Sequence, residues 1–221
     1  MLRIGFVINP IAGMGGRVGL KGTDGVVTEA ERRGAAPVAN ARALEMLQAL
    51  ESLLAGTSCQ DTVTWLTADG NMGHDALRAA GFTAIEILHR CRNVASALDT
   101  TGATENFIAS RVDLVVFCGG DGTARDICSI TGEATPILGI PAGVKMYSGV
   151  FGVTPHRTAE ILARYLAQQI GLARVEIVDL DEDKYRKDEW AVRLYMSARC
   201  PFEPNYVQAA KALVSGQDKK R

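Results

Sequence analysis

The segment Gly119-Gly-Asp-Gly-Thr123 has the composition of a turn that holds phosphate. It directly follows an apolar run, 112–118, whose β-branched residues predict a strand buried on both faces. Glycines allow positive φ angles and a close approach to a ligand, and Thr123 can cap the helix expected over 124–129. Because free N–H groups at a helix N-terminus favour anions, the turn is expected to cradle phosphate. The alternative is an ordinary tight turn with Asp121 as its cap.

Asp121 is the carboxylate of this turn, and it would repel phosphate unless it binds a metal or takes up a proton. Two kinds of chemistry suit it, namely Mg²⁺ binding and general-base catalysis of phosphoryl transfer. We therefore predict Asp121 as the catalytic residue. Its neighbours Gly119, Gly120, Gly122 and Thr123 are the predicted nucleotide-binding residues of this turn.

Two further glycine-containing turns follow predicted strands. The first, 9–22, comes after a strand expected over 2–8, and the second, 141–149, comes after one expected over 135–140. The carboxyl ends of parallel strands lie at one edge of a sheet, where ligands collect. We therefore expect all three turns to converge on one site, although the first could instead be a flexible surface loop. The candidate nucleotide-binding residues in these two turns are Asn9, Pro10, Gly13, Gly15, Gly16, Gly143, Lys145 and Ser148.

Neither of two familiar phosphate-binding patterns fits these turns. A Walker A loop needs Gly-Lys followed by Ser or Thr, whereas Lys21 lies between Leu20 and Gly22. The dinucleotide fingerprint needs glycines at positions i, i+2 and i+5, and counting from Gly13 the last position is Val18. A P-loop nucleotidase and a Rossmann dehydrogenase are therefore not supported.

The periodicity of apolar residues predicts an α/β fold. From Ala173 the pattern changes to alternation with period two, which predicts an antiparallel hairpin of strands 174–181 and 190–198. We expect a Rossmann-like parallel-sheet domain over 1–171, followed by the start of a smaller β-rich domain over 172–221. The acidic turn of the hairpin, formed by Asp179, Asp181, Glu182 and Asp183, could attract Mg²⁺ but suits a solvated turn better, so no residue is predicted as a metal ligand. The remaining predicted elements are strands over 62–67 and 83–88, helices over 39–55, 104–111, 155–170 and 207–214, and a short helix that ends at Ala80.

Composition excludes several classes of protein. The formal net charge is −1, so no basic surface for nucleic acid or membrane is indicated. The chain has five cysteines, an odd number, and none forms a Cys-x-x-Cys pair, which favours free thiols in a reducing cytoplasm. No apolar stretch approaches the roughly 18 residues of a membrane span, and the N-terminus lacks the apolar core of a signal peptide. We therefore expect a cytoplasmic protein.

Three segments together resemble one group of kinases. They are Asn9 to Gly16 followed by Leu20 to Asp24, the run Gly119 to Asp126 reading GGDGTARD, and Gly139 to Ser148 reading GIPAGVKMYS. The Gly-Gly-Asp-Gly-Thr signature is shared by NAD kinases, diacylglycerol kinases, sphingosine kinases and, more distantly, phosphofructokinases. The set as a whole is most similar to the ATP-NAD kinase-like group that includes the acetoin-catabolism protein X.

This resemblance implies a two-domain kinase that binds ATP and Mg²⁺ against the glycine turn. In such families the Asp of the pentapeptide, here Asp121, contacts the acceptor or acts as a base toward its hydroxyl. Phosphoryl transfer depends mainly on positioning and charge neutralisation, which glycine loops, Lys145 and Mg²⁺ would supply. The expected reaction is transfer from ATP to a hydroxyl of NAD, giving NADP.

Two departures from the family pattern limit what is carried over. After the strand that corresponds to 135–140 here, NAD kinases have an Asn-Glu pair and lipid kinases have a Gly-Thr-x-Asn-Asp segment. This chain has Ala142-Gly-Val-Lys145 at that place. Members of this branch also run beyond 221 residues and carry a further Gly-rich segment that this sequence lacks, which predicts a fragment or a truncated paralogue. The alternatives are a same-fold kinase for a lipid or small diol, and a catalytically silent nucleotide-binding regulatory protein. Because a two-stranded hairpin is marginal alone, we also expect a homodimer.

Overall fold

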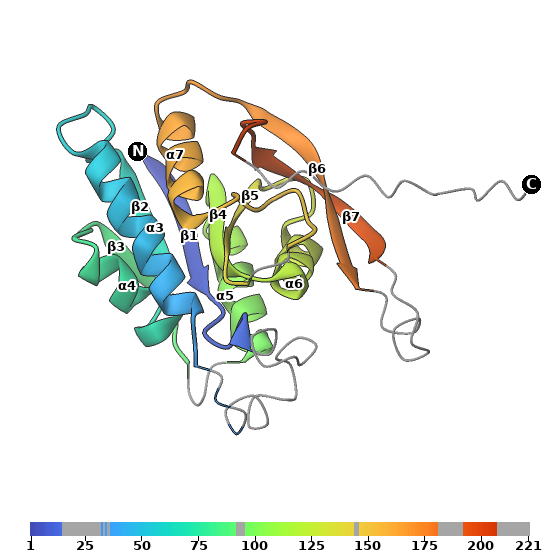
Figure 1. Ribbon diagram of the computed structural model, residues 1–221. Coiled ribbons are helices and arrows are strands. Elements are labelled where there is room, and N and C mark those ends of the chain that lie inside the picture. The colour runs from blue at the N-terminus through green and yellow to red at the C-terminus, as the bar shows by residue number, and fades with distance from the viewer. Residues whose placement is uncertain are drawn as a thin grey trace, which may run out of the picture.

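A five-stranded parallel sheet forms the centre of the computed structural model (Figure 1), with strand order β3-β2-β1-β4-β5. The structure describes residues 1–14, 32, 34, 36–91, 96–143, 146–180 and 192–206. Every residue of β4 is buried, as the apolar run in its sequence predicts. The strands are β1 (Leu2–Ile8), β2 (Val63–Ala68), β3 (Ile85–His89), β4 (Leu114–Gly119) and β5 (Ile137–Pro141).

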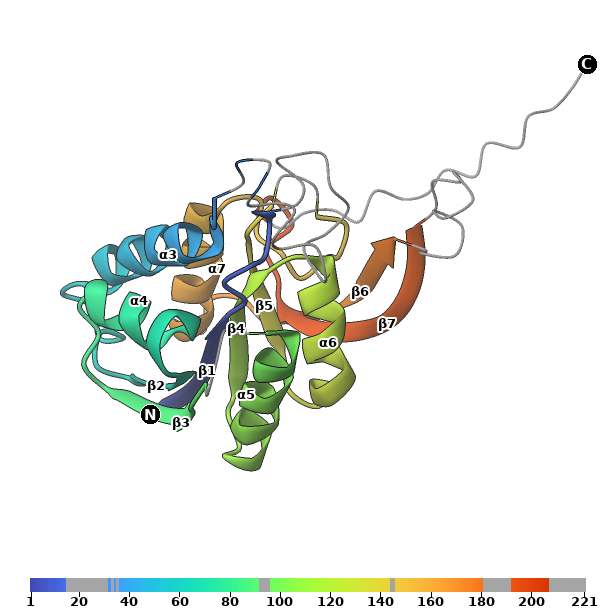
Figure 2. The same cartoon turned by 90° about the horizontal axis from the view of Figure 1, so that it is seen from below.

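Helices cover both faces of this sheet (Figure 2), with α3, α4 and α7 on one side and α5 and α6 on the other. This arrangement confirms the predicted α/β, Rossmann-like fold. The helices are α3 (Ala39–Leu54), the short 3₁₀ helix η1 (Gly70–Met72), α4 (His74–Ala79), α5 (Ala97–Ala109), α6 (Asp121–Thr131) and α7 (Pro155–Leu166).

The apolar stripe expected along α3 is confirmed. Ala43, Leu47, Leu50 and Leu54 recur every three or four residues and are all buried, so one face of the helix packs on the sheet and on α7. The next residues end the helix, and Gly56 has a φ of +71°, a conformation that glycine adopts without strain.

Helices α5 and α7 show the largest departures from the helix boundaries that the sequence predicts. Helix α5 begins seven residues before the expected 104, because Ser96 and Asp99 form a reciprocal capping box at its start. Helix α7 ends at Leu166 rather than at 170, because Gln168 has a φ of +57° and cannot continue the helix.

The antiparallel hairpin packs against the sheet domain. It consists of β6 (Leu172–Leu180) and β7 (Val192–Pro201), which lie against α6 and β5. Ile177, Ala198 and Cys200 are fully buried and belong to the same hydrophobic core as the sheet. The hairpin is therefore stabilised by the first domain. Of the residues expected in the acidic turn, Asp179 lies in β6, whereas residues 181–183 and the helix expected over 207–214 lie outside the described residues.

All five cysteines are free, as the sequence predicts. Three of them are buried, and burial raises their thiol pKa values, to about 11 for Cys128. In the part of the chain that the structure describes, no helix has the length and apolar character that crossing a membrane requires.

Candidate functional site

The turn between β4 and α6 lies at the carboxyl edge of the sheet. Helix α6 begins at Asp121, with Gly120 as its N-cap at φ −115° and ψ −172°. The expectation of positive φ angles is therefore wrong for Gly119, Gly120 and Gly122. Gly120 has an extended backbone conformation, and the helix begins at the next residue. The expected cap is also wrong, because Thr123 lies inside the first helical turn and no side chain caps the helix.

Lack of space explains the glycine at 119 but not the one at 120. A Cβ at Gly119 would lie 2.5 Å from the Cβ of Thr123, so a side chain there would collide with the first turn of α6. A Cβ at Gly120 would meet nothing within 4 Å. The backbone at the start of α6 is thus open on the side of Gly120, where the N–H groups of the first helical turn attract anions.

Asn9 joins the turn after β1 to the turn between β4 and α6. Its side-chain Nδ2 donates a 3.0 Å hydrogen bond to Oγ1 of Thr123, and its backbone N–H donates to the carbonyl of Cys118. Asn9 and Thr123 are both buried, and Pro10 is buried beside them. The carboxyl end of β1 is therefore fixed against the start of α6.

Gly13 brings the turn after β1 against the turn after β5. Its φ is +81°, and a Cβ there would overlap the carbonyl oxygen of Ala142. The N–H of Ala142 in turn donates a 3.0 Å hydrogen bond to the carbonyl of Gly119. The ends of β1, β4 and β5 thus touch one another, as the expectation of convergence requires.

Asp121 fastens the third turn to the start of α6. Its carboxylate accepts hydrogen bonds of 2.9 Å from the backbone N–H groups of Tyr147 and Ser148, and only 8% of the residue is exposed. The hydroxyl of Ser148 donates to the carbonyl of Val178 at 2.9 Å and accepts from its N–H. A chain of polar contacts therefore links α6, the β5 turn and β6.

Burial raises the pKa of the Asp121 carboxyl above its ordinary value. The N–H groups of Ser148 and Tyr147 oppose this shift because they stabilise the charged form, while the negative charge of Asp179 adds to it. Asp121 is thus a buried carboxyl with an enhanced tendency to hold a proton.

Two charged residues that the sequence did not place at this site border the turn. Asp179 reaches over from β6, and its Oδ2 would lie 3.8 Å from a Cβ at Gly122. Its partner is Arg125 of α6, with Nη1 3.1 Å from that oxygen and the guanidinium 5.4 Å from the centre of the Tyr195 ring. Asp121 is therefore not the lone carboxylate near the turn. Arg125 comes four residues after Asp121, a spacing that places both residues on one face of a helix, and this spacing could have identified Arg125 as a neighbour of the turn.

The predicted residues fall into three groups. The structure brings Asn9, Gly13, Asp121, Thr123 and Ser148 together, with the glycines at 119, 120 and 122 between them. Gly143 lies in the third turn, where a Cβ would meet the end of Met146 at 2.6 Å. Gly15, Gly16 and Lys145 lie outside the described residues, so the roles predicted for them stay predictions.

The part of the chain that contains these three turns matches a known protein family. The family model described as the ATP-NAD kinase N-terminal domain matches residues 4–170. The chain belongs to the ATP-NAD kinase family. The match begins at residue 4 inside β1, covers the rest of the parallel sheet and all three turns, and ends just before β6. Neither the curated proteins nor the solved structures yielded a match.

Proposed function

We propose that the chain is an ATP-dependent kinase that phosphorylates a hydroxyl of NAD to give NADP. The observation that carries the proposal is the contact of three strand-end turns around the buried carboxylate of Asp121, within the region that defines the family. Strand-end turns at one edge of a parallel sheet are where nucleotides bind in α/β proteins.

ATP would lie with its phosphates over Gly120. The open space at this residue and the N–H groups of the first turn of α6 favour an anion. The guanidinium of Arg125, one helical turn after Asp121 and paired with Asp179, would add positive charge near the turn. Gly15, Gly16 and Lys145 would complete the phosphate contacts.

Asp121 would contact the acceptor and take its proton. The hydroxyl oxygen would attack the γ-phosphorus, the bond to the leaving ADP oxygen would break, and the hydroxyl proton would pass to the carboxylate. A raised pKa suits this role, because a general base works best when its pKa approaches the working pH. The hydrogen bonds from Tyr147 and Ser148 would hold the carboxylate in place.

Mg²⁺ would accompany ATP and neutralise charge on the transferred phosphoryl group. Carboxylate oxygens are the protein ligands that Mg²⁺ prefers, and Asp179, whose Oδ2 would lie 3.8 Å from a Cβ at Gly122, offers one beside the turn. We propose in addition that the chain belongs to the acetoin-catabolism branch, forms a homodimer and is cytoplasmic.

The test is transfer of labelled phosphate from ATP to a panel of acceptors, with ATP binding measured in parallel. We expect labelled NADP⁺, and a loss of about 10²–10⁴-fold in turnover for Asp121→Asn with ATP binding retained. Labelling of a lipid or small diol instead of NAD⁺ would identify a same-fold kinase with another acceptor. Binding of ATP without any transfer would identify a silent nucleotide-binding protein and contradict the proposal.

A further inference from the structure

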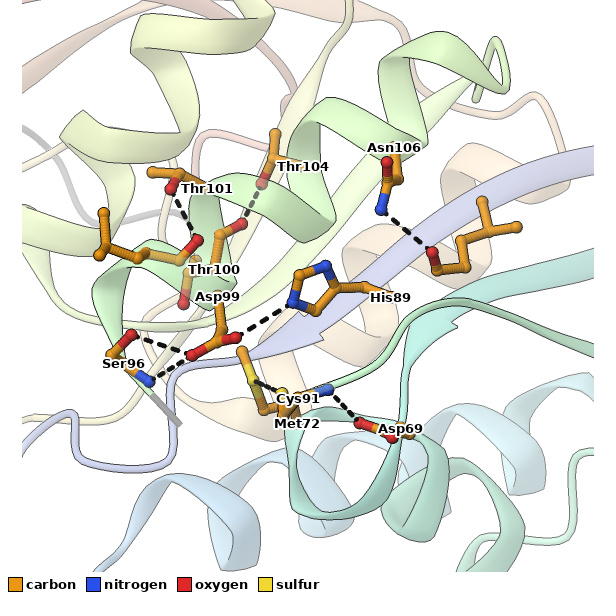
Figure 3. Close-up of polar contacts among 12 residues, drawn as sticks. Asp69, Met72, His89, Cys91, Ser96, Asp99, Thr100, Thr101, Thr104 and Asn106 are labelled. Carbon is orange, nitrogen blue, oxygen red and sulfur yellow. Dashed lines mark hydrogen bonds and ion pairs between the residues drawn. The ribbon is translucent and has the colours of Figure 1, made fainter. Parts of the chain in front are cut away.

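A second cluster of reactive side chains lies at the far edge of the sheet, at the end of β3 and the start of α5. Figure 3 shows His89, Cys91 and Asp99 turned toward one another. The ligand atoms that they offer, a ring nitrogen, a sulfur and a carboxylate oxygen, all lie within 4.8 Å of one another. We refer to these three residues as the His89 cluster.

The spacing within the His89 cluster suits a tetrahedral ion. His89 Nε2 and Asp99 Oδ1 are 3.2 Å apart. Zinc bonds of about 2.0–2.1 Å to nitrogen and oxygen place neighbouring tetrahedral ligands about 3.3 Å apart. The Cys91 sulfur needs an approach of only about an ångström to reach a Zn–S bond near 2.3 Å.

Neighbouring groups hold each of the three residues in position. The other carboxylate oxygen of Asp99 accepts hydrogen bonds from the N–H and the hydroxyl of Ser96, which leaves Oδ1 directed at His89. The His89 ring lies against Gly102, where a Cβ would be 3.0 Å from the ring carbon Cε1. The N–H of Cys91 donates to Asp69 at 2.9 Å. Such outer contacts are typical of orienting shells around protein metal ligands.

Charge and ligand type also favour a cation. Two carboxylates stand beside Cys91, since Asp69 accepts a hydrogen bond from its backbone N–H and the carboxylate of Asp99 lies within 4.8 Å of its sulfur. The Met72 sulfur, 2.9 Å from Cys91 Sγ, adds a second soft atom at the same place (Figure 3). A capping box with a histidine hydrogen bond would account for Ser96 and Asp99, and the hydrogen bond that the Cys91 thiol donates to the Met72 sulfur would account for the direction of the thiol. What a bound ion explains in addition is the convergence of three different ligand atoms within 4.8 Å.

We propose that the His89 cluster binds Zn²⁺, with His89 Nε2, Cys91 Sγ and Asp99 Oδ1 as protein ligands and water in the fourth position. Nitrogen, thiolate sulfur and carboxylate oxygen in a four-coordinate arrangement are ligands that zinc accepts. The thiol proton passes to solvent as the Zn–S bond forms. The ion joins the end of β3 to the start of α5.

This site is separate from the glycine turns. Strand β3 lies three positions from β4 in the sheet, which corresponds to about 14 Å at the usual spacing of about 4.8 Å between strands. The zinc proposal is therefore independent of the proposed kinase activity, and its tests measure metal binding alone.

The main experiment titrates chelator-treated protein with Co²⁺, a spectroscopic substitute for Zn²⁺, and then displaces it with Zn²⁺. We expect one Co²⁺ per chain, a thiolate-to-cobalt charge-transfer band and the visible bands of four-coordinate cobalt. Cys91→Ser should abolish the charge-transfer band, and Cys91→Ser and His89→Gln should each weaken Zn²⁺ binding on the order of tenfold or more. The matched controls are Cys59→Ser, a partly exposed thiol elsewhere, and His74→Gln, a histidine paired with Asp75.

A measurement on the unaltered chain covers the case in which a variant fails to fold. Bound Zn²⁺ should protect Cys91 from alkylation, mapped by mass spectrometry, while Cys59 reacts at the same rate with or without metal. The proposal is overturned if Zn²⁺ binds more weakly than about 10 µM, a free energy near 7 kcal/mol. Equal alkylation of Cys91 with and without zinc, or loss of the cobalt band in the Cys59→Ser control, would overturn it as well.

Discussion

Replacement of Gly13 by alanine tests whether contact between the turns builds the nucleotide site. Two separate costs arise at this residue. Its φ of +81° is unfavourable for any residue with a Cβ, by about 1–2 kcal/mol. The added carbon would also overlap the Ala142 carbonyl oxygen and lie 3.0 Å from a methyl of Val38, closer than the ordinary contact range of 3.4–4 Å.

The matched control is Gly56→Ala. Gly56 has a similar φ of +71°, but a Cβ there meets nothing within 4 Å. The control therefore has the conformational cost alone, and the smaller entropy of the unfolded alanine chain affects both variants alike. Forced movement of packed backbone typically costs a further 1–3 kcal/mol or so, and this is the expected difference between Gly13→Ala and Gly56→Ala.

Thermal melting and ATP titration would measure both variants. In a protein of this size each 1 kcal/mol lowers Tm by roughly 2–4 °C. We expect Gly13→Ala to melt below Gly56→Ala and to bind ATP more weakly, while Gly56→Ala binds ATP as the unaltered chain does. Equal melting temperatures for the two variants, together with unchanged ATP affinity, would refute the argument that this contact shapes the site.

Two further predictions concern the polar contacts around Asp121. Ser148→Ala should lower the free energy of unfolding by about 1–3 kcal/mol, because the buried N–H and carbonyl of Val178 both lose their partner; unchanged stability in urea denaturation would contradict this. The raised pKa of Asp121 means that the folded state holds a proton that the unfolded state releases, so the carboxyl's contribution to stability is fully present below the ordinary value of 3.8 and is lost as pH rises through the folded-state pKa. Relative to Asp121→Asn, the unaltered chain should therefore lose stability as pH rises from 3.8, whereas a difference that stays constant with pH would show an unshifted carboxyl.

The sequence predicted the layers of the fold because apolar periodicity is a strong local signal. The stripe of α3 and the buried run of β4 placed those elements to within two residues. The start of α5 was missed because its first turns carry little apolar pattern, with Leu98 exposed, and depend instead on the capping box of Ser96 and Asp99.

The site was predictable as a set of turns but not as a set of contacts. Glycines after strands indicated where the backbone comes close, yet the partners of Asp121 are backbone N–H groups, which leave no trace in residue types. Asp179 lies 58 positions further along the chain than Asp121 and reaches the turn only through the packing of the hairpin on α6. The His89 cluster was missed for a similar reason, since no spacing rule joins a thiol after one strand to a carboxylate in the next helix.

ATP binding by Gly120→Val is the most direct test of the account. The backbone of Gly120, at φ −115°, accepts a β-branched residue, and a Cβ there meets nothing within 4 Å, so the free protein should lose no more than the modest preference for glycine at a helix N-cap. The matched control is Gly171→Val, which also has open space around it. We predict that Gly120→Val binds ATP at least on the order of tenfold more weakly while Gly171→Val binds normally, a loss equivalent to about 1.4 kcal/mol. Undiminished ATP affinity in a folded Gly120→Val protein would contradict the claim that the turn cradles the nucleotide phosphates.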